Sequence, residues 1–273
     1  MKYTHLIYSL LAVAVLAACQ SPSNKTGMEK FAEDTAFQKA HSSPEAISFQ
    51  GKGEMVQYPT PDGATGSAYS LKAAADSKNY LFVVHEWWGL NDHIKKEAER
   101  LFSELGNVHV LALDIYDGKS TSDPEEAGKI MGGVSEERAQ AIIKGALQFA
   151  GKDAKIATIG WCFGGGWSLR SSILAGDQAA GCVMYYGMPV EKADQLAPLK
   201  ADVLGIFAKQ DDWINEPVIK KFEALAKATG KNLQVQWYDA AHAFANPSNP
   251  KYDQKQAGEA NALALAFLKK HLN

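Results

Sequence analysis

The stretch GWCFGGG, residues 160–166, places a cysteine where an apolar run, KIATIG (155–160), gives way to glycines. The apolar run predicts a buried strand, and GGWSLRSSILA (165–175) predicts a helix. Cys162 therefore lies at a tight turn between a strand and a helix. Three explanations for a thiol at this turn compete: a disulfide, a metal ligand and a nucleophile.

The composition of the whole chain narrows the class of protein. The 273 residues are 46% hydrophobic and 22% charged, which is typical of a globular protein, and the net charge is −3. A surface that binds nucleic acid usually carries a clustered basic excess, and this sequence has none. We therefore expect no nucleic-acid partner.

The N-terminus predicts a secretory signal peptide over residues 1–18. A basic start precedes an apolar core that is too short for a membrane-spanning helix. LAAC (16–19) resembles the bacterial lipobox, which implies that Cys19 is lipidated and anchors the protein to a membrane. An aspartate after this cysteine often holds a lipoprotein at the inner membrane, but here Gln20 follows, so we expect the outer membrane, facing the periplasm. The alternative is a plain signal cleaved nearby, with Cys19 incidental.

The rest of the chain predicts one α/β domain. We interpret residues 19–46 as the lipidated N-terminus and a polar tether with a helical piece at 28–40, and residues 47–273 as the domain. Strands are expected at 54–60, 66–74, 80–86, 107–114, 155–160, 181–187, 202–208 and 233–239, and helices at 92–106, 122–130, 165–175, 216–230 and 256–273. This alternation predicts a mostly parallel central sheet with helices on both faces. In such sheets, ligands bind at the carboxyl ends of the strands.

The residues just past these strands carry the groups that can do chemistry. In chain order they are Glu86, Cys162, the pair Asp211 and Asp212, and His242. The order nucleophile, acid, histidine, with the nucleophile between a strand and a helix, is the arrangement of the α/β-hydrolase fold.

The glycines around the cysteine fit a nucleophile elbow, G-x-C-x-G. In this tight turn the residues two before and two after the nucleophile must be small, and they are Gly160 and Gly164, followed by Gly165. The backbone N–H of Phe163 would point toward a developing oxyanion, and we expect a second donor in the N–H of Trp87. A thiol at a helix N-terminus beside a histidine should have a depressed pKa and be a competent nucleophile.

Five motifs make the chain similar to the dienelactone hydrolases from about residue 50 to 273. They are H-E-W-W-G-L-N (85–91), D-I-Y (114–116), G-W-C-F-G-G-G (160–166), A-K-Q-D-D-W-I (208–214) and A-A-H-A-F (240–244). The resemblance implies that Cys162 is the nucleophile, that His242 is the base and that Asp211 orients it, with Asp212 as the alternative carboxylate. It also implies that Glu86 interacts with the thiol in the resting enzyme and helps to generate the thiolate when substrate arrives.

One departure from the family pattern concerns the substrate. Dienelactone enzymes proper grip a substrate carboxylate with an arginine after the D-x-Y strand end and a polar group after the histidine. Here Lys119 stands in the first region without an arginine, and Ala243 and Phe244 follow the histidine. Bidentate capture of a carboxylate is therefore not evident. The residues expected to line the substrate pocket are Trp88, Trp161, Trp213, Phe244 and Lys119.

The sequence thus predicts a monomeric carboxylic ester hydrolase that acts on small esters or lactones without a metal or an organic cofactor. A thioesterase or general carboxylesterase is the nearest alternative. Two others are an envelope binding protein that keeps the fold without catalysis and a redox-responsive protein in which Cys162 and Cys182 pair. Cys182 lies in a predicted buried strand, where a free cysteine usually acts as a small apolar residue. The chain has no CxxC, and HEWWG (85–89) lacks the second histidine of a zinc HExxH motif.

Overall fold

The computed structural model describes residues 27–74 and 76–272. The predicted signal peptide over residues 1–18 and the predicted lipidation site at Cys19 lie outside the described residues.

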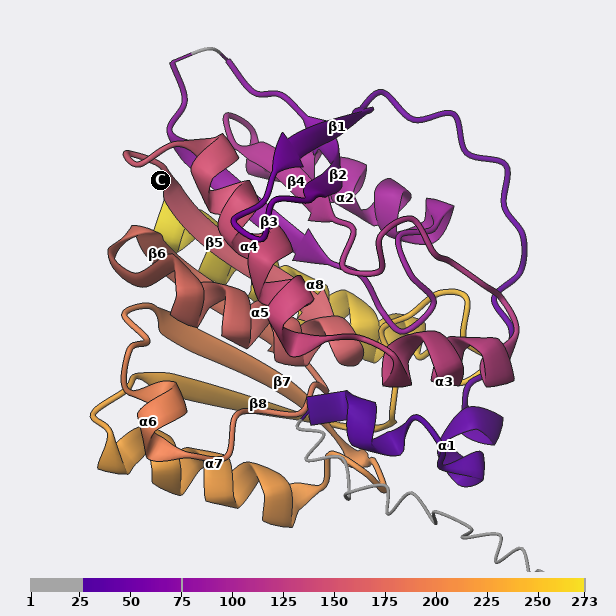
Figure 1. Cartoon of the computed structure of the whole chain (residues 1–273). Helices are drawn as coiled ribbons and strands as arrows, with labels where there is room; N and C mark the ends of the chain where they lie inside the picture. The colour runs from indigo at the N-terminus through magenta and orange to yellow at the C-terminus, as the bar shows by residue number, and fades with distance from the viewer. Residues whose placement is uncertain (1–26, 75, 273) are drawn as a thin grey trace, which may run out of the picture.

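A central eight-stranded sheet organises the chain, in the order β1-β2-β4-β3-β5-β6-β7-β8 (Figure 1). The strands are β1 (Glu54–Pro59), β2 (Thr65–Leu71), β3 (Asn79–Val84), β4 (His109–Leu113), β5 (Lys155–Trp161), β6 (Ala179–Tyr185), β7 (Asp202–Gln210) and β8 (Leu233–Ala241). Strands β1 and β2 form an antiparallel hairpin, β2 pairs antiparallel with β4, and every pair from β4 to β8 is parallel. The predicted mostly parallel sheet is confirmed.

Helices cover both faces of the sheet, as expected. Helices α4 (Glu136–Ala150) and α5 (Phe163–Ala175) pack on one face, and α2 (Asp92–Leu105) and α8 (Gln254–Leu272) pack on the other (Figure 1). The remaining elements are α3 (Pro124–Gly132), α6 (Ala193–Leu196), α7 (Glu216–Ala228) and the short 3-10 turn η2 (Gly176–Gln178). In the described part of the chain, no helix has the length and apolarity needed to cross a membrane.

Helix α4 was absent from the elements predicted by the sequence. Its start is well marked, because the Ser135 side chain accepts from Arg138 N–H (3.2 Å) and two glutamates occupy the first turn. Ile142 and Ile143 are fully buried among the apolar residues of its inner face. The same capping and periodicity would have identified the helix from sequence.

The sheet carries its apolar residues on both faces, which explains the continuous apolar runs in its strands. In β3, the four residues from Leu81 to Val84 are all fully buried. A strand that is covered on both faces does not need to alternate apolar and polar residues. Only the ends of such a strand contact solvent or a functional site. The polar and chemically active residues therefore begin where β3, β5, β7 and β8 end.

The N-terminal segment, residues 27–41, packs against the domain. It contains η1 (Gly27–Phe31) and α1 (Thr35–Ala40), which together match the helical piece predicted at 28–40. Asp34 caps α1 by accepting from the N–H groups of Ala36 and Phe37 (2.8 and 3.2 Å). Met28 and Phe37 are fully buried. This part of the predicted tether, 19–46, is therefore docked on the fold.

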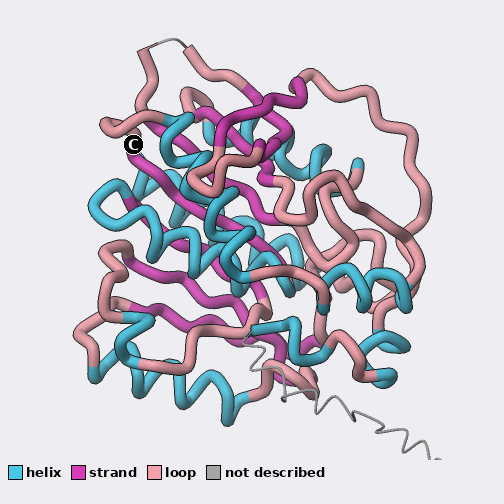
Figure 2. Tube along the Cα trace, in the orientation of Figure 1, coloured by secondary structure: helices cyan, strands magenta, loops and turns pink. Residues whose placement is uncertain are grey.

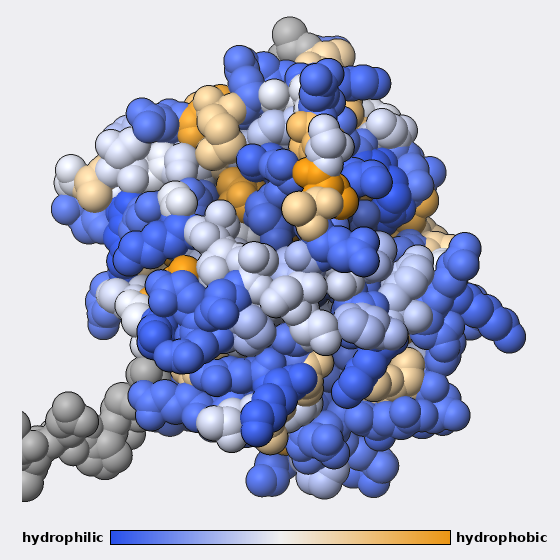
Figure 3. All heavy atoms as spheres, turned by 90° about the vertical axis from the view of Figure 1, so that its right-hand side faces the viewer, coloured by the Kyte–Doolittle hydropathy of each residue, from blue (hydrophilic) through white to orange (hydrophobic). Residues whose placement is uncertain are grey.

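The segment lies at the edge toward which β7 and β8 run, beside α3 (Figure 1). A long loop, residues 41–53, then leads from it to β1 along the same side of the molecule (Figure 2). Viewed from this side, the surface is largely hydrophilic, with apolar residues in small separate patches (Figure 3).

Candidate active site

Cys162 occupies a strained turn between β5 and α5. Its backbone has φ 54° and ψ −116°, a conformation that residues other than glycine rarely adopt. The turn is fixed on both sides, because Cys162 N–H donates to the Tyr185 carbonyl (3.0 Å) and Gly165 N–H donates to the Cys162 carbonyl (3.0 Å). Strain of this kind costs of the order of 1–3 kcal/mol and persists where the surrounding structure enforces it.

Two of the predicted elbow glycines are required by close backbone packing. A Cβ atom on Gly160 would collide with the carbonyl of Gly164, and a Cβ on Gly164 would collide with the carbonyls of Val84 and His85. Gly165 faces similar crowding, since its Cβ would lie 2.5 Å from the Tyr185 carbonyl. Helix α5 can therefore begin directly against β3 and β5 only with these residues.

Asp211 and His242 come together from the ends of β7 and β8. The Nδ1 atom of His242 lies 2.5 Å from Oδ2 of Asp211, and both side chains are buried. Oδ1 of Asp211 accepts from the N–H groups of Trp213 and Ile214, both at 2.9 Å. Asp212 is exposed to solvent, so Asp211 is the carboxylate that faces the histidine.

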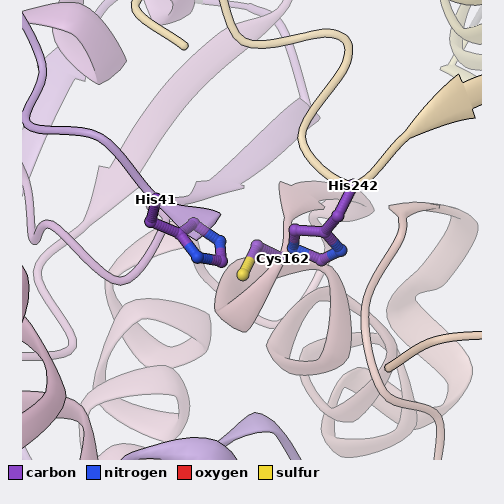
Figure 4. Close-up of side chains that lie close together, drawn as sticks. All are labelled: His41, Cys162 and His242. Atoms are coloured by element: carbon purple, nitrogen blue, oxygen red, sulfur yellow. The ribbon is translucent and has the colours of Figure 1, made fainter. Parts of the chain in front are cut away.

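The Cys162 side chain lies beside the His242 ring (Figure 4). One ring nitrogen of His242 lies within 4.8 Å of Sγ of Cys162. Because Nδ1 is paired with Asp211, Nε2 is the nitrogen left to face the thiol. Burial alone would lower the pKa of His242, but the charges of Asp211 and of a Cys162 thiolate outweigh burial and raise it to about 10. The aspartate thus favours a charged imidazole beside the sulfur.

The thiol itself departs from the expected depressed pKa. Burial raises the pKa of Cys162 above its ordinary value, and the opposing effects of the His242 charge and the Phe163 N–H do not cancel the rise. The side chain is 1% exposed, so a thiolate would lose almost all of its hydration. The helix end and the histidine can be recognised in the sequence, whereas this burial depends on the fold.

Glu86 follows β3 and is also buried. Burial raises its pKa to about 7, although the charge of His242 and a hydrogen bond from Asn246 act in the opposite direction. Oε2 of Glu86 accepts from Nδ2 of Asn246 at 2.5 Å. Among the described residues, the hydrogen-bond partner of Glu86 is thus Asn246 in the loop after β8. The charge of Glu86 acts on the Cys162 thiol without a hydrogen bond between them.

A cavity of about 310 Å³ borders Glu86. Trp161 and Asn246 line it together with residues of α2, among them Arg100. The Arg100 guanidinium is held by the carboxylates of Glu97 and Glu104, at 2.5–2.9 Å. The cavity therefore combines an aromatic wall with polar groups, as small-molecule sites commonly do.

The residues predicted to line a single pocket are spread over several places. Trp161 lines the cavity beside Glu86, and the other four do not. Trp88 packs on Trp87, with ring centroids 4.7 Å apart, and Trp213 packs on Phe37 at 5.2 Å. Phe244 is fully buried against the ring of Tyr186, and Lys119 is exposed. Their positions near strand ends did not reveal which way each side chain points.

The N-terminal segment covers the site, which the sequence reasoning missed. The Phe37 ring lies 5.4 Å from the Trp87 ring and 6.0 Å from the His242 ring. The His41 ring lies 4.6 Å from Trp87 and 5.2 Å from His242. His242 is only 5% exposed as a result. The available signal was the apolar spacing of Met28, Phe31 and Phe37 within an otherwise polar stretch.

The disulfide explanation is wrong for the two domain cysteines, because Cys162 and Cys182 are both free. Cys182 is buried in β6 with Ser168 Oγ 3.6 Å from its sulfur. It is packed in the core as predicted, but the hydroxyl groups of Ser168 and Thr158 lie beside its sulfur.

Two features of this sheet define an α/β-hydrolase. One is a cysteine at a tight turn between a strand and a helix, in the position of the nucleophile, and the other is an Asp–His pair at the carboxyl edge. The model of the Dienelactone hydrolase family matches residues 67–272, and the chain belongs to this family. The predicted enzyme class, a hydrolase like the dienelactone hydrolases, is confirmed at that level.

Known relatives agree with this assignment. The chain is 30% identical to "Protein usf" of Aquifex pyrophilus over 205 residues, which cover 70% of this chain and 88% of the relative. It is 25% identical to "Carboxymethylenebutenolidase 1" of Cupriavidus pinatubonensis over 227 residues, which cover 78% and 95% of the two chains.

Solved structures share the fold. A dienelactone hydrolase-like promiscuous phosphotriesterase, P91, from metagenomic libraries superposes with a TM-score of 0.70 at 21% identity, covering 82% of this chain and 100% of its own. The dienelactone hydrolase of Anabaena variabilis gives a TM-score of 0.59 at 16% identity, with coverages of 82% and 100%.

Proposed function

We propose that this protein is a carboxylic ester hydrolase that cleaves small esters or lactones with Cys162 as its nucleophile. The observation that supports this most strongly is the alignment of Asp211, His242 and Cys162 at a strained elbow, with the carboxylate 2.5 Å from the imidazole. The name of the relative from Cupriavidus, carboxymethylenebutenolidase, supports a lactone or ester as the substrate class.

The first half of the proposed reaction forms a thioester. Nε2 of His242 accepts the thiol proton, and Sγ of Cys162 attacks the ester carbonyl carbon. The oxyanion is stabilised by the N–H of Phe163 and, as the family arrangement suggests, by that of Trp87. The intermediate then collapses, the C–O bond breaks, and His242 returns the proton to the leaving oxygen.

The second half releases the acid. His242 takes a proton from water, the resulting hydroxide attacks the thioester carbonyl, and Cys162 leaves and regains a proton from His242. Asp211 holds the imidazole in one tautomer and stabilises its charged form in both halves. Because a thiolate departs more readily than an alkoxide, the first intermediate tends to revert unless the substrate's own leaving group departs easily. Enol lactones and aryl esters meet this condition.

Glu86 has a proposed part in controlling the thiol. The resting thiol keeps its proton because burial raises its pKa, and a charged Glu86 raises that pKa further. This effect of the Glu86 charge on the thiol pKa disappears when a substrate displaces the carboxylate or when Glu86 is protonated. The thiolate then forms more easily. Activation of the nucleophile is thereby linked to occupation of the site.

The test compares hydrolysis of an aryl ester and of a dienelactone by the native protein and by two cysteine variants. We expect Cys162→Ala to lower kcat/KM for both substrates by at least ~10³-fold, as the loss of a nucleophile does in other hydrolases. Cys182→Ala, the matched control, should retain most of the activity. Equal activity in the native protein and Cys162→Ala would contradict the proposal.

We also propose a lipid anchor at Cys19 that holds the enzyme in the bacterial cell envelope. It is supported by the LAAC motif at the end of a signal-like segment. Labelled palmitate should enter the native chain and not Cys19→Ser when both are expressed in a bacterium. Equal labelling of the two chains would rule the anchor out.

A further inference from the structure

The N-terminal segment brings a second histidine to the nucleophile. His41 and His242 approach Cys162 from opposite sides, with the sulfur between their rings (Figure 4). One ligand atom from each of the three residues lies within 4.8 Å of the other two, and all three side chains are buried. His41 plays no part in the hydrolytic scheme above.

Both imidazoles point a ring nitrogen into this space, and a metal ion bound there would displace any proton that the nitrogen carries. Nδ1 of His41 lies 2.7 Å from the Phe37 carbonyl, which can only accept, so Nδ1 carries the proton and Nε2 is the basic nitrogen. The Asp211 carboxylate fixes the same tautomer in His242. The two Nε2 atoms are buried, and neither has a hydrogen-bond partner among the residues that the structure describes. Burial and the neighbouring His242 lower the pKa of His41 to about 3, so its ring is neutral.

We propose that His41, Cys162 and His242 form a binding site for a soft divalent cation such as Zn²⁺, which blocks the nucleophile when bound. One thiolate and two imidazoles are ligands that zinc prefers, whereas Mg²⁺ and Ca²⁺ prefer oxygen. Each imidazole also donates its other N–H to a carbonyl or carboxylate oxygen, the outer contact that zinc-bound histidines usually make.

The geometry needs only a small contraction. Tetrahedral Zn²⁺ with bonds of 2.0–2.3 Å holds its ligand atoms about 3.5 Å apart. His41 stands at the end of the short helix α1, so a small shift of the N-terminal segment can bring its ring closer to the other two ligands. The negative charges of the thiolate and Asp211 balance the two positive charges of the cation. A fourth position stays open for water.

The cation takes the two atoms that the hydrolytic scheme needs free, Sγ of Cys162 and Nε2 of His242. Inhibition by the metal rests on the proposed function, whereas the metal site itself does not. The test therefore uses binding as its main readout and activity as its second.

The experiment measures Zn²⁺ affinity of the full-length protein by competition with a chromophoric chelator, and the absorption spectrum after Co²⁺ is added. We expect 1:1 binding and a thiolate-to-cobalt charge-transfer band that is lost in Cys162→Ala. His41→Ala should bind Zn²⁺ at least ~100-fold more weakly, since it removes one of three ligands. It should keep ester hydrolysis that Zn²⁺ no longer inhibits at the concentration that inhibits the native enzyme.

Two further variants keep the test decisive. His41→Gln preserves the size of the side chain and should show the same loss of affinity if His41→Ala folds poorly. His109→Ala removes a histidine of β4 that contacts Tyr80 instead of the site, and it should bind Zn²⁺ as the native protein does. Unchanged affinity in both His41 variants, or a cobalt spectrum without the thiolate band, would overturn the proposal.

Discussion

At the scale of single residues, the site contains buried charged groups that are stabilised by backbone N–H groups and neighbouring side chains. Asp211 is ionised in the interior because two backbone N–H groups and His242 surround it. Burial disfavours its charge, yet these partners lower its pKa below the ordinary value. The carboxylate can therefore orient the imidazole at neutral pH.

Replacing Asp211 by asparagine should leave the fold intact and remove most of the activity. An amide in this place can no longer stabilise the charged imidazole and can favour the wrong tautomer, so we expect kcat to fall by ~10³–10⁴-fold. Steady-state hydrolysis of an aryl ester measures the effect. The exposed neighbour provides the control, because Asp212→Asn should change kcat by less than about twofold. A similar loss in both variants would contradict the assignment of the carboxylate.

Glu86 should make the stability of the protein depend on pH. Its pKa is about 7 in the fold and about 4.5 when unfolded, so the folded state holds a proton that the unfolded chain has already lost. The stability that this proton provides is present below pH 4.5 and is lost as the pH rises through 7, by up to about 3 kcal/mol. Urea unfolding at several pH values measures it.

The Glu86→Gln variant cannot titrate at this position. Its free energy of unfolding should therefore fall less between pH 4.5 and 8 than that of the native protein. Parallel pH profiles for the two proteins would show that Glu86 is not held neutral by burial.

At the scale of elements, the start of α5 decides how Cys162, the proposed nucleophile, is positioned. The helix begins one residue after Cys162 and presses its first glycines against the end of β3. A side chain there must push the helix away from the sheet, and Cys162 and the N–H of Phe163 would move with it.

Gly164→Ala should therefore destabilise the protein and impair catalysis together. Collision of the new methyl group with two backbone carbonyls predicts a loss of roughly 2–4 kcal/mol in the free energy of unfolding. Gly258→Ala is the matched control, because Gly258 is an exposed residue within α8 with no atom near its Cβ position. That change should stabilise the helix by up to ~1 kcal/mol. Thermal unfolding distinguishes them, and equal effects would contradict the packing argument.

The strands, and the placement of Cys162, Asp211 and His242 at their ends, could be predicted from the sequence. Other features of the site could not. Apolar runs such as β3 identify buried strands, and the elbow glycines with Asp211 and His242 follow from spacing and chain order. Asn246 was not predictable as the partner of Glu86, because that contact depends on the path of the loop after β8. The burial that raises the pKa of Cys162 likewise comes from residues distant in sequence.

At the scale of the whole molecule, the N-terminal segment closes the carboxyl edge of the sheet over the thiol. Its apolar contact with the site centres on Phe37, which packs between Trp87 and Trp213. Polar contacts reinforce it, since Trp167 Nε1 donates to Glu29 (2.9 Å) and Trp213 Nε1 donates to Asp34 (3.1 Å). Local opening of a short docked segment costs less than global unfolding, so this cover can control access to the site.

Phe37→Ala should therefore expose the thiol of Cys162. Removing the ring takes away most of the apolar contact of α1, and we expect iodoacetamide to alkylate Cys162 at least ~10-fold faster. Phe49→Ala serves as the control, because Phe49 packs on Tyr69 away from the site. An unchanged alkylation rate in Phe37→Ala would show that access to Cys162 does not depend on the segment.

Hydrolysis by the proposed route passes through a covalent acyl-enzyme on Cys162. The most direct test is mass spectrometry of the full-length protein quenched with acid during turnover of an aryl ester, followed by peptide mapping. We expect one added acyl group on the peptide that contains Cys162, removed by hydroxylamine as a thioester should be. Turnover with the acyl group on another residue, or with no covalent adduct under rapid quenching, would contradict this route.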